Sequence, residues 1–123
     1  MGQQARDSDA VEVIRLKHTE FVAEIRSQLK AKRIQQYNIQ SDELTGQYLN
    51  IRTAEFHHIR RQSINVDLIS MIWNGLIVNK DTHALITSRN VSDEYDLISL
   101  CQEMGWNESW FHPYQQKILD FGF

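Results

Sequence analysis

The part of the chain that decides the fold begins with Phe56-His57-His58-Ile59 and resumes, after a spacer, with Asn74-Gly75-Leu76-Ile77-Val78-Asn79-Lys80-Asp81-Thr82-His83. The apolar run at 76–78 predicts a short buried strand, and another strand is expected over residues 54–59. Asn79 and Asp81 are both suited to cap a helix that carries His83. The expected order is therefore strand, loop, strand and helix, with a histidine pair in the first element and one more histidine in the last.

Upstream of this core, the sequence predicts one long amphipathic helix over residues 9–34. Apolar side chains recur at three- and four-residue intervals and gather on one face: Val11, Ile14, Phe21, Val22, Ile25 and Leu29, with His18 among them as a buried histidine. Arg26, Lys30 and Arg33 share another face, which either follows a phosphate backbone or is a solvated surface. A loop over residues 35–41 and a turn or hairpin over residues 44–49 follow.

The rest of the chain predicts short connections and helices. Residues 64–73 read as a short helix or an ordered loop. Ser92 is expected to cap a helix that ends at Gly105, and Pro113 is expected in the first turn of a last helix. These helices supply the packing that a small strand–helix core needs.

Length and composition indicate a single domain. The chain has 123 residues, of which 41% are hydrophobic and 24% charged, and it contains no repeat or linker. We expect a helical extension over 1–40, a core over 44–90 and C-terminal helices over 91–123. Cys101 is the only cysteine, which excludes an internal disulfide and a cysteine-based zinc cage. A polar N-terminus and the lack of a long apolar run favour a cytoplasmic protein with no membrane partner.

The charge balance argues against nucleic acid as a partner, but its distribution weakens that argument. The formal net charge is −3. Residues 1–61 carry ten Lys and Arg against eight Asp and Glu, whereas residues 62–123 carry three against eight. The basic excess therefore lies in the half of the chain that leads into the histidine pair.

The histidine pair, Asn74 and His83, in this order of elements, resemble the HNH nuclease family with its ββα-metal fold. The resemblance covers about residues 55–89, and residues 44–53 continue it. The nine-position step from Asn74 to His83 is its most specific part. The resemblance implies an α+β fold, a small ββα-metal core carrying a long N-terminal helix and additional C-terminal helices.

The resemblance also implies a role for each of these residues. His57 and His83 would be metal ligands, His58 the general base, and Asn74 would hold the loop or the ring of that base. A neutral imidazole can accept a proton from water at physiological pH. Thr87 stands where some relatives have a further ligand, so water and phosphate would complete the shell. Such a site suits one divalent ion, Mg²⁺ or Mn²⁺, with Ni²⁺ and Zn²⁺ as alternatives.

Three further expectations concern the geometry of the site and its substrate. Neighbouring residues of a regular strand point to opposite faces, so the family places its histidine pair where the strand gives way to a loop, and the same is expected here. The helix N-terminus near His83 would favour a bound phosphate. Basic side chains near the motif are candidate phosphate ligands, with surface solubility or pairing to acids as the alternative: Arg52, Arg60, Arg61 and Lys80.

The implied function is that of a metal-dependent endonuclease that hydrolyses DNA phosphodiester bonds, with RNA as the alternative substrate. The alternative is a non-catalytic module that binds nucleic acid or a protein partner on the same scaffold. A third reading is a small domain that a metal holds together. An acidic domain of this size offers little basic surface, so a homodimer or a larger complex is expected to help bind DNA.

Overall fold

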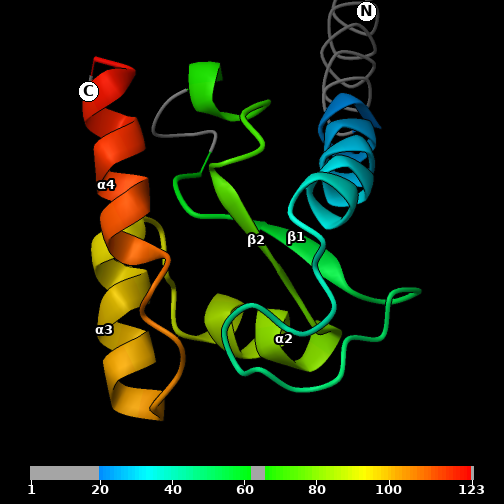
Figure 1. The fold of residues 1–123 in the computed structure, drawn as a ribbon, viewed down its shortest axis with the longest axis vertical. Coiled ribbons are helices and arrows are strands. Elements are labelled where there is room, and N and C mark those ends of the chain that lie inside the picture. The colour runs from blue at the N-terminus through cyan, green and yellow to red at the C-terminus, as the bar shows by residue number, and fades with distance from the viewer. Residues whose placement is uncertain (1–19, 62–65, 123) are drawn as a thin grey trace, which may run out of the picture.

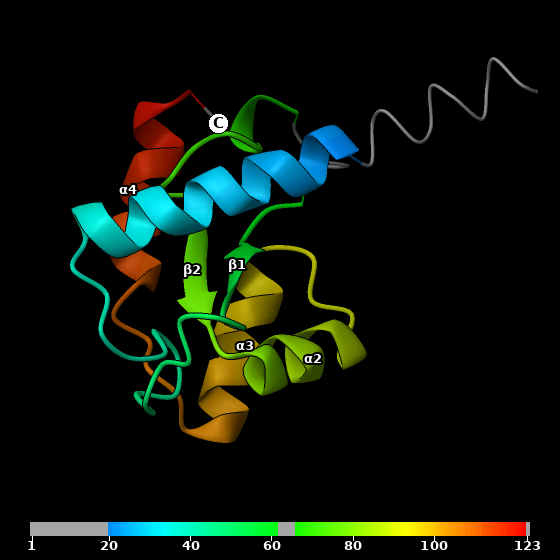
Figure 2. The same cartoon turned by 90° about the vertical axis from the view of Figure 1, so that its right-hand side faces the viewer.

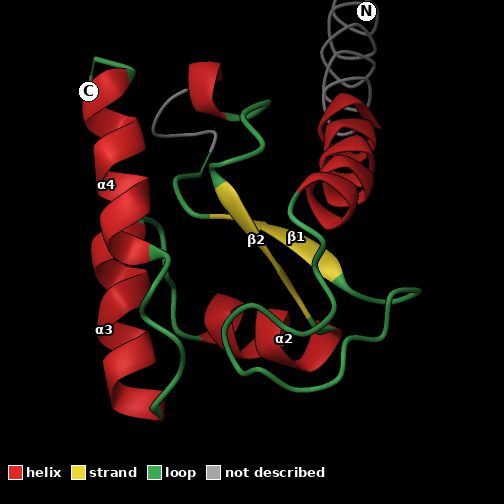
Figure 3. Cartoon of the chain, in the orientation of Figure 1, coloured by secondary structure: helices red, strands yellow, loops and turns green. Residues whose placement is uncertain are grey.

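The computed structural model describes residues 20–61 and 66–122. Figures 1 and 3 show the elements in order: an N-terminal helix over residues 20–36, then β1 (Glu55–His58), the 3-10 helix η1 (Val66–Leu68), β2 (Gly75–Val78), α2 (Lys80–Ser88), α3 (Glu94–Met104) and α4 (Phe111–Asp120). The chain is a mixed α+β protein, as the sequence predicts. The expected helix start near Asp9 and the expected role of His18 lie outside the described residues.

β1 and β2 form a two-stranded antiparallel sheet, which confirms both expected strands. Glu55 pairs with Val78 at one end and His58 pairs with Gly75 at the other. Gly75 is required by packing, because a Cβ atom there would collide with the ring of Phe56. The missing side chain lets that ring lie across the start of β2.

The sheet lies between two helical layers. The N-terminal helix crosses one face, and α2, α3 and α4 lie toward the other (Figure 2). Alternate strand residues therefore enter different clusters. Phe56 and Ile77 pack with Leu29 of the N-terminal helix, whereas Leu76 and Val78 pack among apolar side chains of α2, α3 and α4.

Glu43 covers the outer edge of β2. Its backbone N–H donates to the carbonyl of Ile77 at 3.0 Å, and its carboxylate accepts the N–H of Ile77 at 2.6 Å. The same carboxylate accepts two hydrogen bonds of 2.8 Å from Arg33, which also donates to the carbonyl of Ile72 at 3.1 Å. Arg33 is thus buried in an internal ion pair and is not part of an exposed basic stripe. Among the residues that the structure describes, no strand pairs with the outer edge of β1.

The start of α2 is fixed by a residue that is distant in sequence. The side chain of Asn79 makes no capping bond; it accepts the N–H of Asn50 at 3.0 Å and donates to the carbonyl of Tyr48 at 2.8 Å. The buried carboxylate of Asp42 instead accepts from the N–H of Asn79 at 2.8 Å and from the hydroxyl of Thr82 at 2.7 Å. Asn79 is the residue at the N-cap of α2, as expected, but its side chain does not cap the helix, because the backbone of residues 48 and 50 engages it.

The other helix ends follow the sequence more closely. Asp93, one residue after the expected Ser92, caps α3 by accepting the N–H of Asp96 at 2.9 Å. Gly105 ends α3 in the left-handed conformation at φ 69°, as predicted. Pro113 lies in the first turn of α4, also as predicted. No helix in the described part of the chain is both long and apolar enough to cross a membrane.

Candidate functional site

A cavity of about 390 Å³ lies along the outer edge of β1. Its walls come from the N-terminal helix, β1, the residue Arg61 after β1, the connection that follows η1, and the segment from α2 to Val91. Three of the expected site histidines line it: His57, His58 and His83. This volume is within the range of small-ligand sites.

His57 points toward α2, and its ring centroid lies 5.3 Å from that of His83. The side chain is 6% exposed, and its Nε2 is buried with no hydrogen-bond partner. Burial, reinforced by the neighbouring His83, lowers the pKa of His57 to about 3. The ring is therefore neutral at physiological pH and keeps a lone pair for a ligand.

His83 is oriented by Glu55, whose carboxylate contacts its Nδ1. Nδ1–H is the donor in this contact, because the carboxylate can only accept. Nε2 is then the nitrogen that can bind a metal, and a carboxylate behind a ligating histidine is a common support in metal sites. In residues 20–61 and 66–122, no three His, Cys, Asp or Glu side chains are grouped to hold a metal ion. Within these residues, His57 and His83 are two imidazoles that lie beside each other at the cavity.

His58 lies on the other face of β1 from His57. Its ring packs edge-on against Phe56 at a centroid distance of 5.0 Å, and its Nε2 lies 2.8 Å from the carbonyl oxygen of Ile69. Burial lowers its pKa below the ordinary 6.5. His57 and His58 are the last two residues of β1, so the pair lies where the strand gives way to the connection, as expected. The side chains of His57 and His58 point to opposite faces of β1 but line the same cavity, because this cavity extends past the edge of the strand to both faces of the sheet.

Asn74 is fully buried behind the site and holds the connection that follows β1. Its amide nitrogen donates to the carbonyls of Arg60 at 3.1 Å and Leu68 at 3.0 Å. Its amide oxygen accepts the N–H of Arg60 at 3.1 Å and the hydroxyl of Tyr114 at 2.8 Å. Asn74 therefore joins the start of the connection between the strands to η1, and its side-chain hydrogen bonds go to this connection and to α4 rather than to the His58 ring.

The basic residues named from the sequence separate into two groups. Arg61 lines the cavity, whereas Arg52, Arg60 and Lys80 do not. The guanidinium of Arg60 donates to both carboxylate oxygens of Glu94, at 2.9 and 2.8 Å, and this bonding raises its pKa. Arg60 is thus held in a structural ion pair.

The start of α2 is occupied by an acid rather than open to an anion. Asp42 accepts hydrogen bonds there from Asn79 and Thr82. A phosphate at this end would meet the carboxylate of Asp42, so the expected contribution of the helix N-terminus is not supported.

Sequence reasoning did not assign Glu55 or Arg26 to the site. Glu55 could have been found, because it is two positions before His57 and therefore shares its face of the strand. Arg26 lines the cavity from the N-terminal helix. The sequence grouped it with Arg33, and only the docking of the helix separates the roles of these two arginines. Thr87 also lines the cavity.

Comparisons of the chain with protein-family models, with curated proteins and with solved structures gave no significant match.

Proposed function

We propose that this protein is a metal-dependent endonuclease of the HNH type that hydrolyses DNA phosphodiester bonds, with residues 44–90 as its ββα-metal core. One observation carries the proposal: three imidazoles with different hydrogen bonding border the same cavity. His57 has a buried nitrogen without a partner, and His83 lies beside it with one nitrogen engaged by a carboxylate. His58 is tied to a backbone carbonyl. This combination supports a pair of metal ligands beside a general base.

The donor set fits a divalent cation at His57 and His83. A buried imidazole nitrogen without a hydrogen bond is costly to keep, and a bound cation would remove that cost. A divalent ion held there would polarise the scissile phosphate and stabilise the leaving oxygen. Mg²⁺ or Mn²⁺ is the proposed ion, and Ni²⁺ or Zn²⁺ would also suit imidazole nitrogen.

His58 supplies the base. Its Nε2–H donates to the carbonyl of Ile69, because a carbonyl can only accept, so Nδ1 carries the lone pair. During hydrolysis the oxygen of water bonds to phosphorus, the bond to the leaving oxygen breaks with its electron pair, and the water proton passes to Nδ1. The lowered pKa of His58 keeps the ring neutral before this step.

Asn74 is proposed as a positioning residue for this base. The Asn74 amide donates to the carbonyl of Leu68, and the carbonyl of the next residue, Ile69, accepts the hydrogen bond from His58. Loss of the Asn74 amide would release this connection and with it the orientation of the His58 ring.

The proposal is tested by plasmid cleavage with Mg²⁺, with Mn²⁺ and with EDTA. Wild-type protein is expected to nick or linearise supercoiled plasmid only when a metal is present. His58→Ala is expected to lose cleavage while its circular dichroism spectrum stays unchanged. His112→Ala is the matched control, because His112 is exposed on α4 and does not line the cavity.

Equal cleavage by His58→Ala and wild type would show that His58 is not the base. The second candidate function, a binding module without catalysis, is favoured by the lack of a three-residue metal group in the described part of the chain. It predicts that wild-type protein binds DNA and cleaves none under any of the three conditions.

A further inference from the structure

The cavity beside β1 is positively charged in a protein whose net charge is negative. The formal net charge is −3, yet among residues 20–61 and 66–122 no Asp or Glu side chain lines the cavity. Two arginines, Arg26 and Arg61, line it together with the three histidines. Such a separation of charge attracts an anion to the cavity despite the overall repulsion.

The two arginines approach the cavity from different elements. Arg26 is on the N-terminal helix and Arg61 follows β1. Both side chains border the same cavity as His57, His58 and His83.

Neither guanidinium group has an ion pair or a hydrogen bond with any described residue. Three other arginines behave differently: Arg33, Arg60 and Arg89 each bind a carboxylate at 2.8 to 3.0 Å. The cavity thus gathers arginines without counter-charges, and their forked donors match the oxygens of a phosphate group.

We propose that Arg26 and Arg61 together bind a backbone phosphate of the nucleic-acid substrate, so that the N-terminal helix completes the site. This inference rests on the proposed function for the class of its ligand. Binding by the arginine pair needs no metal, because both donors belong to the chain. The N-terminal helix therefore does more than cover the sheet: its docking through Arg33 and Leu29 places Arg26 over the edge of β1.

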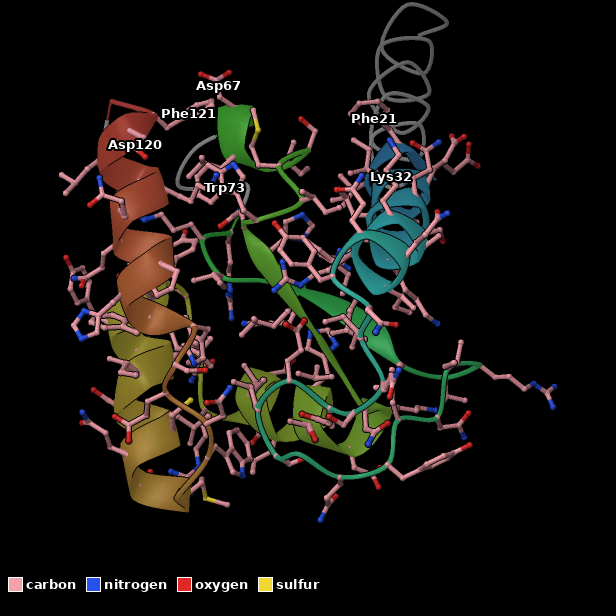
Figure 4. All side chains as sticks on the ribbon, viewed as in Figure 1. Phe21, Lys32, Asp67, Trp73, Asp120 and Phe121 are labelled. Atoms are coloured by element: carbon pink, nitrogen blue, oxygen red, sulfur yellow. The ribbon has the colours of Figure 1, made fainter. Side chains whose placement is uncertain are left out.

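The experiment measures binding of a fluorescently labelled short DNA duplex in EDTA over a range of salt concentrations. Each phosphate contact contributes about 0.9 to the slope of log K against log salt. Arg26→Gln and Arg61→Gln are each expected to weaken binding and to reduce this slope by about 0.9. Lys32→Gln is the control with the same charge change. Lys32 is an exposed residue of the same helix (Figure 4) and does not line the cavity, so the slope of Lys32→Gln should remain at the wild-type value.

The inference is overturned if the slope of log K against log salt is the same for Arg26→Gln, Lys32→Gln and wild type. It is also overturned if wild-type protein does not bind DNA. These outcomes are separate from failure of the nuclease proposal. If wild-type protein binds the duplex with the expected slopes and cleaves no plasmid with metal, the phosphate site stands and the catalytic assignment fails.

Discussion

The hydroxyl of Tyr114 donates a hydrogen bond of 2.8 Å to the side-chain oxygen of Asn74. Both residues are buried, and burial raises the pKa of the Tyr114 phenol, so the hydroxyl keeps its proton. This bond joins α4 to the amide that holds the connection between the strands. The C-terminal helix thereby supports the candidate site although it contributes no side chain to the cavity.

Tyr114→Phe is expected to lower the free energy of unfolding by about 1 kcal/mol, because the buried amide oxygen of Asn74 loses one of its two donors. Cleavage should fall without any change in metal affinity, since the effect reaches His58 and not the ligand pair. Urea denaturation and plasmid cleavage measure the two effects. Tyr95→Phe is the control, because Tyr95 is 57% exposed. Equal losses in the two variants would contradict the role of the Tyr114 bond.

Glu55→Gln is expected to weaken Mn²⁺ or Ni²⁺ binding by about ten- to a hundredfold, because a carboxylate behind a ligating histidine orients its ring and raises its basicity. Isothermal titration calorimetry measures this affinity. Glu103→Gln removes a carboxylate from the exposed pair with Arg89 and should leave the affinity unchanged. If Glu55→Gln binds metal as tightly as wild type, the contact between Glu55 and His83 has no part in metal binding.

The stability of the metal-free protein should depend on His57 in acid. The pKa of this residue is about 3 in the folded state and about 6.5 when the chain is unfolded. Below about pH 6.5 the unfolded chain binds a proton that the folded chain excludes, so the free energy of unfolding falls as the pH is lowered toward 3. The contribution of this group to that slope is at most about 1.4 kcal/mol per pH unit.

His57→Leu isolates that contribution. The free energy of unfolding is measured by urea denaturation in EDTA at several pH values. Between pH 6 and pH 4, the range in which His57 should protonate only in the unfolded chain, this free energy is expected to change less with pH in His57→Leu than in wild type. The variant should also be at least as stable as wild type at neutral pH, because the unsatisfied Nε2 is removed. If the free energy of unfolding changes with pH in the same way for His57→Leu and wild type, the buried, neutral state of His57 is contradicted.

Gly75→Ala is expected to destabilise the protein by about 1 to 3 kcal/mol through overpacking, since the new Cβ would occupy the space of the Phe56 ring. Thermal unfolding measures the loss. The double variant Gly75→Ala, Phe56→Leu provides the control: the smaller side chain should recover part of the stability relative to Phe56→Leu alone. No recovery would place the cause outside this contact.

Several local features were predictable from the sequence because they depend on neighbours along the chain. The apolar run at 76–78 became β2, the strand expected around residues 54–59 became β1, and Gly105 ended α3. The juxtaposition of His57 with His83 was also expected, although only through a family resemblance and not from spacing alone. The residue roles taken from that resemblance stay predictions.

Other features were decided by tertiary contacts. The carboxylate of Asp42 holds Asn79 at the start of α2, Glu94 binds Arg60, and Glu43 binds Arg33. Each of these pairings joins residues at least ten positions apart, so no local pattern shows it. The sequence does not distinguish two arginines on one helix. Only the folded chain shows which of them binds a carboxylate from a distant segment.

The sequence by itself therefore determined the two strands, most of the helix boundaries and the presence of histidines that can meet across the core. Only the tertiary structure decided which nitrogen of each imidazole is engaged, which arginines face the cavity, and that His57 and His58 reach it from opposite faces of one strand. The physical reason is that periodicity fixes the face of an element on which a residue lies. Burial, hydrogen-bond partners and unpaired charge depend on what the rest of the chain brings to that face.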